Sequence, residues 1–312
     1  MSIGANIKKR RYELRMSQQE LADAMGYKTR STIAKIESGE IDVSHKKLQR
    51  FAEALDITLE ELISGFKASS IKLLPELDDS ERNRNVCIIL AGGKTGRNSQ
   101  NIPSQFISVK GRPIIVHSMD AYQSHPMIDD IYVVCLKGWE NIVKAYAEEY
   151  GITKLKGIVP GGASGIASLK NAMVTIKDFY SPDDVIFIQE STRPLVSTET
   201  ISRLLGACAE KGSGTICHSM NDYVQFDISG GGAKYVERSS IIAMQSPEAH
   251  KFSRLREVFA KAAREKHALT ESCCTMFLYN LGFEINFIES SINNIKIIRE
   301  EDLATVGALL KD

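Results

Sequence analysis

The chain has 312 residues, of which 43% are hydrophobic and 25% are charged, and its formal net charge is zero. That length is sufficient for two hydrophobic cores, and the composition is that of a soluble globular protein. A net charge of zero gives no indication of nucleic-acid binding. No apolar run reaches the roughly 18 residues that a membrane span needs. The first residues, MSIGANIKKRRYEL, are basic without a long apolar stretch, so we expect no secretory signal and a cytoplasmic location.

The cysteines do not form a pattern of cross-links. Only two of them are close in sequence, and those two are adjacent. The cysteines are Cys87, Cys135, Cys208, Cys217, Cys273 and Cys274. This spacing fits neither a set of disulfides nor a zinc knuckle. We expect buried, reduced thiols, as in cytoplasmic proteins.

A polar segment divides the sequence into two parts. Residues 67–84 are mostly polar and charged, with one proline and a short apolar patch, and we interpret them as a linker. We therefore expect one domain over residues 1–66 and another over residues 85–312. The first 67 residues contain 12 Lys and Arg against 10 Asp and Glu. This small excess of positive charge fits a solvent-exposed helix face as well as it fits contacts with phosphates.

Five short helices are predicted in the N-terminal domain. Ser17 and Glu20 form a capping box, in which each side chain binds a backbone N–H that the helix leaves without a partner. After a tight turn, a second short helix carries Ile33 and Ile36 on its inner face. A second capping box, beginning at Thr58, opens the last helix.

Two short helices joined by a tight turn, the second with a polar start, are typical of a helix-turn-helix. The segment MSQQELADAMGYKTRSTIAKIESGE and its flanks resemble the phage-repressor/Cro (XRE) family of DNA-binding domains over residues 2–64. The resemblance implies that the second helix enters the major groove of DNA. The residues that it assigns to DNA are Gln18, Lys28, Thr29, Arg30, Ser31 and Lys35. Arginine suits guanine O6 and N7, and Gln, Ser and Thr suit phosphates or mixed base edges.

From residue 85 onward, apolar segments alternate with helical ones. Continuous apolar runs occur at 86–90, 131–135 and 185–188, and helical patterns occur at 113–124, 140–150, 165–178 and 198–211. Wholly apolar strands that alternate with helices predict an α/β domain whose parallel sheet is covered on both faces. Ligands in such folds bind at the carboxyl ends of the strands.

A glycine-rich loop follows the first predicted strand, in the segment IILAGGKTGRNSQNIPSQF. The loop can present backbone N–H groups at Ala91, Gly92 and Gly93 to a triphosphate, and Lys94 and Arg97 add positive charge. Glycine turns are common, so the loop by itself indicates phosphate binding only weakly.

The wider pattern of residues 85–312 resembles the CTP-dependent cytidylyltransferases that act on methylerythritol phosphate and ribitol phosphate, and is closest to the ribitol-phosphate branch. The resembling segments are IILAGGKTGRNSQNIPSQFISVKGRPIIVHSMDAY, PGGASGIASLKNAM, IQESTRPLVS, VERSSIIAMQSPEAH and INNIKIIREEDL, in that order. The resemblance implies a Rossmann-like, mostly parallel sheet of the nucleotidyltransferase type, with a β-hairpin dimerisation arm.

The resemblance also assigns roles to residues of this chain. Arg97 and Lys296 would be catalytic, and Asp222 and Arg238 would lie on an arm that reaches the site of a partner subunit. Glu190 would bind Mg²⁺ if the domain is active. The nucleotide, CTP or a CDP-linked ligand, would be bound by Ala91, Gly92, Gly93, Lys94, Gly161, Gly162, Ser168 and Arg193, with Ser168 at the cytosine.

Several positions depart from the pattern of that family. Its phosphate-binding lysine is Ser104 here, and an arginine of its second glycine loop is Gly165. Its His-Asp pair is Gln189-Glu190, the Asp-Thr of its arm is Asp222-Tyr223, and a later Thr-Asp is Thr270-Glu271. One lost cation can cost about 10³–10⁵ in rate, by analogy with an arginine finger.

These departures favour binding over turnover. The leading hypothesis is a transcriptional regulator whose C-terminal domain is a weakly active or inactive cytidylyltransferase that binds a nucleotide, a CDP-polyol or a sugar phosphate. The alternative is an active CTP:polyol-phosphate cytidylyltransferase with an accessory DNA-binding domain. In two further alternatives, the C-terminal domain is only a dimerisation scaffold, or the N-terminal helices bind only proteins.

The segment YVQFDISGGGAKYVERSS, residues 223–240, predicts a β-hairpin, because polar and apolar residues alternate on either side of three glycines. In the resembling enzymes this hairpin crosses to a second subunit, where Arg238 would enter the site. An isolated two-stranded arm is only marginally stable, so it needs a surface to pack on. We expect a homodimer through the C-terminal domain; the alternative is a hairpin that packs on its own domain.

Overall fold

We describe the protein from a computed structural model. The structure describes residues 3–14, 16–27, 29–41, 43, 45–55, 57, 62, 83–93, 102–220 and 223–310. The chain forms two compact units, Met1–Glu81 and Arg82–Asp312. Within the described residues, no helix is both long enough and apolar enough to cross a membrane.

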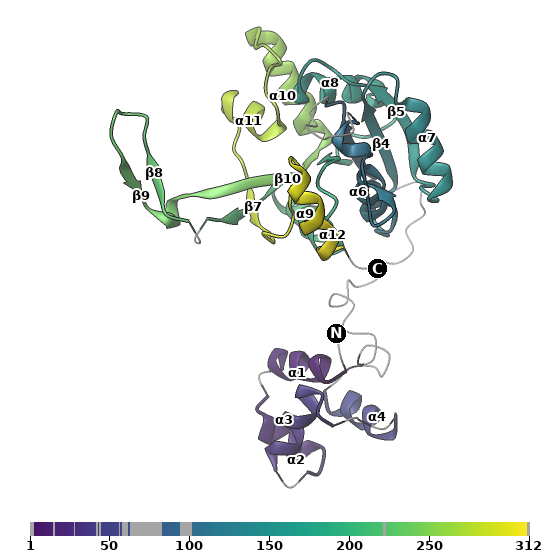
Figure 1. Ribbon diagram of the computed structural model, residues 1–312, viewed down its shortest axis with the longest axis vertical. Coiled ribbons are helices and arrows are strands. Elements are labelled where there is room, and N and C mark those ends of the chain that lie inside the picture. Colours follow the sequence, from purple (N-terminus) through teal and green to yellow (C-terminus); the bar gives the residue numbers. More distant parts are fainter. Residues whose placement is uncertain are drawn as a thin grey trace. The chain divides into compact units, whose positions relative to one another are not determined.

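Helices alone make up the described part of the N-terminal unit (Figure 1). They are α1 (Ile3–Glu13), α2 (Gln18–Ala24), α3 (Arg30–Ser38) and α4 (His45–Ala54). Their core contains, among others, Ile7, Leu21, Ile33, Phe51 and Leu55. A Cβ atom on Gly4 would lie 2.1 Å from the carbonyl oxygen of Ile36, so α1 approaches α3 more closely than a side chain at this position would allow. The predicted helix that opens at Thr58 lies outside the described residues.

A seven-stranded sheet forms the centre of the C-terminal unit. In spatial order its strands are β11 (Phe287–Glu289), β7 (Ser213–Ser219), β10 (Ile242–Lys251), β6 (Val185–Glu190), β1 (Asn85–Ala91), β4 (Asp130–Cys135) and β5 (Leu155–Pro160). Strands β6, β1, β4 and β5 run parallel to one another, and β10 runs antiparallel to β6 and β7. The carboxyl ends of β1, β4, β5 and β6 therefore meet at one edge of the sheet.

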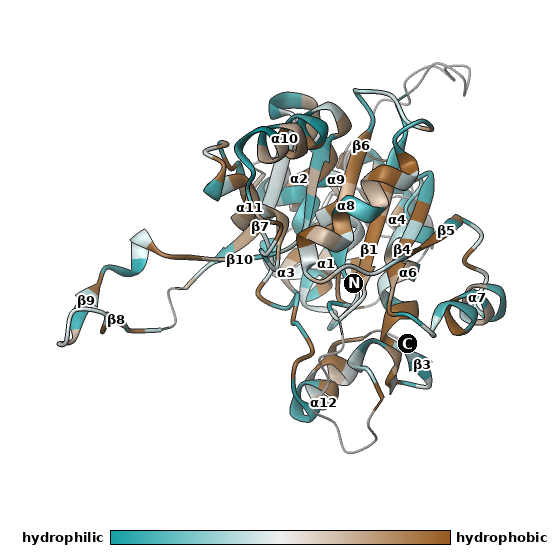
Figure 2. Ribbon diagram, turned by 90° about the horizontal axis from the view of Figure 1, so that it is seen from above, coloured by the Kyte–Doolittle hydropathy of each residue, from teal (hydrophilic) through white to brown (hydrophobic). Residues whose placement is uncertain are grey.

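Helices cover both faces of this sheet, and the hydropathy colours of Figure 2 show the central strands as its most apolar part. They are α6 (Ile114–Gln123), α7 (Glu140–Glu149), α8 (Gly165–Ile176), α9 (Thr198–Lys211), α10 (Phe252–Glu265) and α11 (Cys274–Asn280). Val306 of α12 (Glu300–Leu309) packs instead in a separate cluster with Val109, Ile114 and Ile297. Two single 3₁₀ turns, η1 (Ser104–Phe106) and η2 (Arg238–Ser240), lie in the connections.

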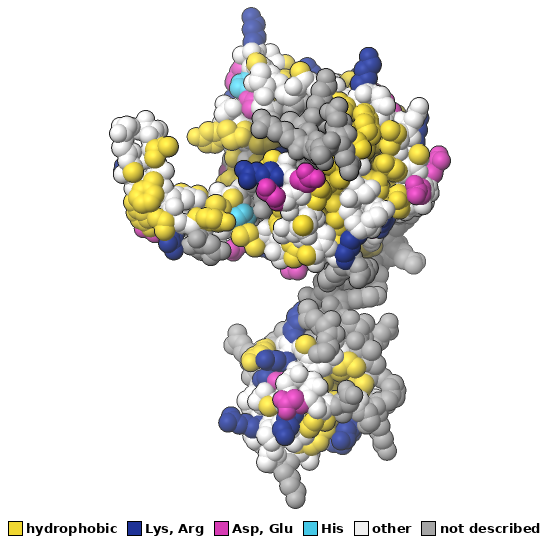
Figure 3. All heavy atoms as spheres, viewed as in Figure 1, with side chains coloured by type: hydrophobic (Ala, Val, Ile, Leu, Met, Phe, Trp, Pro, Cys, Tyr) yellow, Lys and Arg dark blue, Asp and Glu magenta, His cyan; other side chains and the backbone are white. Residues whose placement is uncertain are grey.

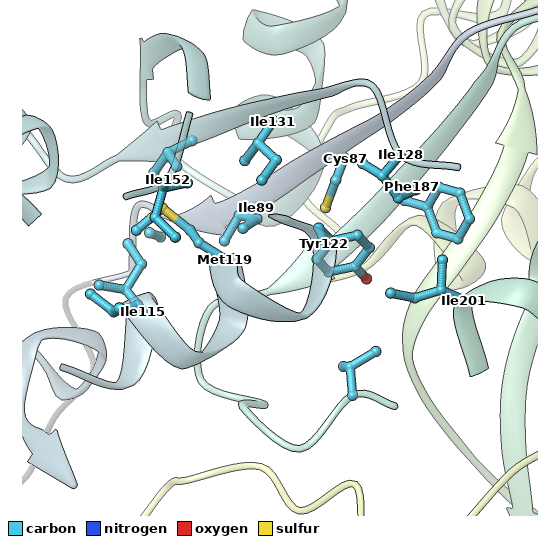
Figure 4. Packing of buried hydrophobic residues seen from close by; sticks show 14 of the residues in the cluster. Cys87, Ile89, Ile115, Met119, Tyr122, Ile128, Ile131, Ile152, Phe187 and Ile201 are labelled. Atoms are coloured by element: carbon cyan, nitrogen blue, oxygen red, sulfur yellow. The ribbon is translucent and has the colours of Figure 1, made fainter. Parts of the chain in front are cut away.

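Two cores lie on opposite faces of the sheet, and the strands contribute to both. Cys87 and Ile89 of β1 pack with α6, α7 and α9, as Figure 4 shows for α6. The residue between them, Ile88, packs with α8, α10 and α11. Successive side chains of a strand point to opposite faces. Burial on both faces therefore explains why the predicted strands are apolar at every position.

Two further strand pairs lie outside the main sheet. Strand β2 (Ser108–Val109) pairs with β3 (Arg112–Pro113), and β8 (Gln225–Asp227) pairs with β9 (Lys234–Val236), both antiparallel. Strands β8 and β9 lie within the segment for which a hairpin was predicted. In Figures 1 and 2 this hairpin extends away from the sheet and its helices.

The predicted fold class is confirmed, since helices at the N-terminus are followed by an α/β unit with a mostly parallel sheet. The ranges predicted as helical at 113–124, 140–150, 165–178 and 198–211 correspond to α6, α7, α8 and α9. The linker predicted at 67–84 lies outside the described residues apart from residues 83 and 84.

Candidate DNA-binding surface and nucleotide site

Helices α2 and α3 have the local structure that their sequence predicts. The Ser17 hydroxyl accepts a hydrogen bond from the backbone N–H of Glu20 at 3.1 Å, and the Glu20 carboxylate accepts one from the backbone N–H of Ser17 at 2.6 Å. Helix α3 ends at Gly39, whose left-handed backbone, with φ of 82°, suits glycine. The capping box and the glycine therefore fix the start of α2 and the end of α3.

The predicted DNA-binding residues of α3 lie on its outer side. Ile33 and Ile36 are buried in the helical core, whereas Thr29, Arg30, Ser31 and Lys35 are exposed. Lys28 lies outside the described residues. Lys and Arg side chains are spread over the visible face of this unit in Figure 3. The exposed side of α3 is thus polar and basic, as contact with phosphates and base edges requires.

Gln18 belongs to a buried polar network that the sequence analysis missed. The guanidinium of Arg11 donates to both carboxylate oxygens of Glu37, at 2.6 and 3.0 Å, and Gln18 Nε2 donates to Glu37 Oε2 at 2.9 Å. Arg11 and Glu37 are 4% and 7% exposed, so their charges neutralise each other away from water. The network holds the start of α2 against α3 and leaves one N–H of Gln18 to donate elsewhere.

Replacing Arg30 with alanine is expected to weaken binding to a specific operator by about 1–3 kcal/mol and to relax base choice. The reason is the exposed guanidinium at the start of α3. Fluorescence anisotropy at a fixed salt concentration, with specific and random duplexes, measures this. Lys8→Ala on the exposed face of α1 is the control, because a phosphate contact affects all sequences alike. Equal losses on both duplexes for Arg30→Ala would contradict the groove assignment.

Two glycine loops meet at the carboxyl edge of the sheet. A Cβ atom on Gly92, after β1, would lie 3.2 Å from the Cα of Gly161, after β5. Both loops are tied to the end of β4, since Gly161 N donates to the carbonyl oxygen of Cys135 and Leu136 N donates to that of Ala91. Glycines at these positions let the two backbones approach, and the structure therefore brings together two of the segments predicted to bind the nucleotide.

Ser168 lies beneath the second of these loops. Its hydroxyl accepts a hydrogen bond from the backbone N–H of Gly162 at 2.9 Å, and the side chain is buried. The hydroxyl hydrogen is still able to donate to a ligand such as a base. Ser164 caps α8 by accepting from the backbone N–H of Ala167, so the positive end of this helix dipole lies at the same loop.

The first glycine loop is anchored by a buried glutamine. Gln105 Nε2 donates to the carbonyl oxygens of Ala91 and Gly93, at 2.9 and 3.1 Å. Gly93 itself is exposed, while Ser104, at the position of the family's lysine, is only 5% exposed. Lys94 and Arg97 lie outside the described residues.

The predicted metal ligand, Glu190, is held between two cations. Arg193 Nε donates to Glu190 Oε2 at 2.7 Å, and Lys296 Nζ donates to Glu190 Oε1. The Ser246 hydroxyl donates to Oε2 at 3.4 Å, and Arg193 also donates to the carbonyl oxygen of Asn294 at 2.8 Å. Glu190, Arg193, Ser246 and Lys296 line a cavity of about 190 Å³ where the carboxyl end of β6 lies beside β10. The structure thus brings together Glu190, Arg193 and Lys296, which the sequence placed in three separate roles.

This arrangement sets the charge state of Glu190. Burial by itself raises the pKa of its carboxyl, but the charges and hydrogen bonds of Lys296 and Arg193 outweigh burial and hold the pKa below its ordinary value. The carboxylate is therefore ionised at neutral pH, and its ion pairs are lost only as the pH falls through that lowered pKa. Because both oxygens of Glu190 accept hydrogen bonds from cations, an Mg²⁺ ion would have to use their remaining lone pairs or displace Lys296.

Gln189, at the position of the family's histidine, has a structural role. It is fully buried, accepts a hydrogen bond from the Tyr122 hydroxyl at 3.1 Å, and donates to the backbone oxygens of Glu190 and Arg193 at 2.8 and 2.9 Å. These bonds hold the turn that follows β6. The side chain does not line the cavity.

Gly165 shows why an arginine is missing from the second loop. A Cβ atom at this position would lie 2.0 Å from the carbonyl oxygen of Ser272, in the segment that leads into α11. The backbone of Ile166 also donates to the carbonyl oxygen of Glu271 at 3.2 Å. The segment before α11 therefore lies directly on the start of α8, in space that a side chain at residue 165 would need.

Gly165→Ala is accordingly expected to destabilise the C-terminal unit by about 1–3 kcal/mol, because its methyl group forces the segment at Ser272 to shift. Urea unfolding followed by circular dichroism measures this change. The matched control is Gly206→Ala in α9, where a Cβ atom meets nothing within 4 Å and alanine favours the helix. Equal stability of Gly165→Ala and wild type would contradict this account.

One of the two predicted arm residues falls within the described part of the chain. Arg238 is exposed in η2 at the base of the hairpin and does not line the cavity of its own chain. Asp222 lies outside the described residues.

Comparison with known proteins agrees with this fold. Residues 85–312 match the family of 2-C-methyl-D-erythritol 4-phosphate cytidylyltransferases, and residues 7–62 match a helix-turn-helix family. A ribitol-5-phosphate cytidylyltransferase of Lacticaseibacillus paracasei is 30% identical over 229 residues, which cover 73% of this chain and 98% of that protein. A 2-C-methyl-D-erythritol 4-phosphate cytidylyltransferase of Clostridium acetobutylicum is 28% identical over 230 residues, which cover 73% and 97%.

Solved structures show the same fold at lower identity. The 2-C-methyl-D-erythritol 4-phosphate cytidylyltransferase of Francisella tularensis superposes with a TM-score of 0.61 at 22% identity, covering 73% of this chain and all of that one, 100%. The 4-diphosphocytidyl-2C-methyl-D-erythritol synthase of Anaerococcus prevotii gives 0.60 at 18% identity, covering 74% and 97%. Residues 85–312 thus make this chain a member of the 2-C-methyl-D-erythritol 4-phosphate cytidylyltransferase family, joined in one polypeptide to a helix-turn-helix domain.

Proposed function

We propose that the protein is a cytoplasmic, DNA-binding transcriptional regulator whose C-terminal domain binds CTP, a CDP-polyol or a sugar phosphate and turns it over weakly or not at all. The helix-turn-helix domain, with its polar and basic α3, would bind the operator. The cytidylyltransferase-like domain would sense the ligand through the glycine loops, Ser168 and Arg193, together with Lys94 and Arg97.

The observation that carries this proposal is the pairing of Glu190 with Lys296 and Arg193. Transfer of a cytidylyl group requires cations aimed at the negative charge that builds up on the α-phosphate. Here Lys296 and Arg193, which belong to the site, donate to a carboxylate of the same chain. The one carboxylate offsets only one of the two positive charges, so less cationic charge is left for a transition state while the site stays positive toward an anionic ligand.

Two of the departures from the family pattern support the same conclusion. Ser104 supplies no cation at the position of the phosphate-binding lysine. Gly165 lies too close to the carbonyl oxygen of Ser272 for an arginine side chain to fit. The packing of the domain therefore excludes the family's cation at this position. Loss of a single such donor typically costs about 10²–10³ in rate.

A homodimer through the C-terminal domain is part of the proposal. The hairpin and its base expose six large apolar side chains, which suits burial against a second copy. They are Tyr223, Val224, Phe226, Ile228, Tyr235 and Ile242. In Figure 3 hydrophobic side chains gather on the arm. A two-fold dimer would pair the DNA-binding domains, as an operator with inverted half-sites requires.

Calorimetry and a pyrophosphate assay test the proposal together. The protein is titrated with CTP, and is then incubated with CTP, Mg²⁺ and a panel of polyol phosphates that includes ribitol 5-phosphate and 2-C-methylerythritol 4-phosphate. We expect saturable CTP binding with pyrophosphate release far below the usual enzyme range of about 1–10³ s⁻¹. Absence of binding by any nucleotide or CDP-polyol would leave the domain as a dimerisation scaffold.

The second candidate function is an active CTP-dependent cytidylyltransferase with an accessory DNA-binding domain. It is favoured by the 30% identity to a ribitol-5-phosphate cytidylyltransferase over 98% of that protein's length. In this case Mg²⁺ would enter with the nucleotide phosphates, and Lys296 would have to release Glu190. Turnover in the ordinary range with one polyol phosphate would establish it in place of the proposal above.

A further inference from the structure

A second group of polar side chains lies beneath α8, α10 and α11, beside the cavity that Glu190 lines. Glu248 and His250 are two residues apart on β10, so their side chains point to the same face. They stand opposite Ile188 and Ile186 of β6, which belong to the core beneath α8, α10 and α11. Cys274, the first residue of α11, is part of that core. The fold therefore brings three potential metal ligands from two distant segments into one apolar layer.

The three side chains are close to one another and shielded from water. One donor atom from each of Glu248, His250 and Cys274 lies within 4.8 Å of the other two. His250 Nε2 and Glu248 Oε2 are 3.2 Å apart, and the hydroxyl of Thr275 donates to Glu248 Oε2 at 2.8 Å. The three residues are 3%, 1% and 2% exposed in the order Glu248, His250 and Cys274.

One polar atom of this group has no partner. Among the described residues nothing accepts from or donates to His250 Nδ1, although this atom is fully buried. Leaving a buried polar group without a hydrogen bond costs about 1–3 kcal/mol, and a bound ion is one of the explanations for such a group in a native protein. A buried carboxylate likewise needs a compensating charge.

We propose that Glu248, His250 and Cys274 bind a divalent transition-metal ion, for which Zn²⁺ is the probe. One carboxylate, one imidazole and one thiolate form a ligand set of the kind that zinc accepts, with bond lengths of about 2.0–2.3 Å. Such bonds place tetrahedral ligand atoms about 3.3–3.7 Å apart. In this structure the ligand atoms lie within 4.8 Å of one another, and the separation of His250 Nε2 and Glu248 Oε2, 3.2 Å, is already close to that spacing.

The same geometry supplies an entrance and an open fourth position. Glu248 and Cys274 line the cavity of about 190 Å³ whose other wall carries Glu190 and Lys296. An ion bound by three protein ligands would direct its fourth position into this cavity, where water or an oxygen of a bound phosphate could coordinate it. The metal site would thus adjoin the nucleotide site while using none of the residues assigned to it. It also differs from a zinc knuckle, because its ligands are brought together by the tertiary fold.

Metal analysis and cobalt spectroscopy on the full-length protein test this proposal directly. Protein stripped with a chelator and dialysed against micromolar Zn²⁺ is expected to retain one ion per chain. Co²⁺ in its place is expected to show the intense bands of a tetrahedral site and a thiolate-to-cobalt charge-transfer band. Absence of retained metal, or a cobalt spectrum without the thiolate band, would overturn the proposal, and neither measurement depends on CTP binding, turnover or DNA.

Variants locate the site. Cys274→Ser and His250→Gln are each expected to weaken Zn²⁺ binding by at least the roughly 10–100-fold that loss of an outer-shell partner costs. The matched control is Cys273→Ser, the adjacent thiol, which also lines the cavity but is not in the ligand set. Unchanged binding in both ligand variants, or a loss confined to Cys273→Ser, would place the metal elsewhere. Circular dichroism confirms that each variant is folded, and the wild-type cobalt spectrum remains decisive if one is not.

Discussion

Deleting residues 223–238 and closing the gap with a short turn is expected to convert a homodimer into monomers and to lower DNA affinity. Strands β8 and β9 pair only with each other in the described chain, and an isolated two-stranded sheet is marginally stable in water. Their exposed apolar side chains, such as Phe226 and Ile228, therefore need a second surface. Because the arm lies outside the main sheet, its removal leaves both cores of the C-terminal unit intact.

The loss of DNA affinity follows from the loss of pairing. Two half-sites bound by a linked pair of domains exceed the affinity of one by about 10²–10⁴. A linker of the length predicted at residues 67–84 would span tens of Å when extended, so the half-site spacing is expected to be loose rather than fixed. Light scattering gives the oligomeric state, and anisotropy with one and two half-sites gives the affinity.

A pair of point variants provides the control for this deletion. Phe226→Asp places a charge on the arm, whereas Phe179→Asp places one at a residue that is 70% exposed and lies outside the hairpin. Only Phe226→Asp is expected to weaken the dimer. A deletion variant that stays dimeric would show that the interface lies elsewhere in residues 85–312.

Ser104→Lys is expected to raise any trace of cytidylyl transfer by about tenfold or more, because it returns a cation to the phosphate site. Recovery is expected to remain partial, since Gly165, Gln189 and Tyr223 also depart from the family pattern and such groups act together. Ser104 is 5% exposed at the start of η1, so the ammonium group must extend along its own apolar stem to reach a ligand.

The measurement is pyrophosphate release from CTP with saturating polyol phosphate. Ser108→Lys is the matched control, since this serine is exposed on β2 only four residues further along the chain. It adds the same positive charge at a position other than that of the family's lysine. An equal gain from both variants would reduce the effect to general electrostatic attraction. Wild-type turnover within about 1–10³ s⁻¹ would show that the departures did not abolish catalysis.

Local patterns predicted much of what the structure shows. Ser17 and Glu20 predicted the start of α2, because a capping box joins residues only three positions apart. The apolar run at 86–90 predicted β1, because both faces of that strand are covered. In each case the interactions that decide the structure lie within a few residues, or depend only on a residue being apolar.

Contacts between distant residues decided the site. Glu190 and Lys296 are 106 residues apart, and no spacing rule predicts that the expected metal ligand is paired with the expected catalytic cation. From the sequence, Gly165 is simply a glycine where the family has an arginine. The structure shows that the backbone of Ser272 leaves no space for a side chain there. Cys274 appeared to be a plain buried thiol, and only the packing of α11 on β10 sets it beside Glu248 and His250. The sequence identifies each side chain and the chemistry it can perform. Charge compensation, steric exclusion and metal-ligand geometry depend on distances between residues far apart in the chain, and folding alone sets those distances.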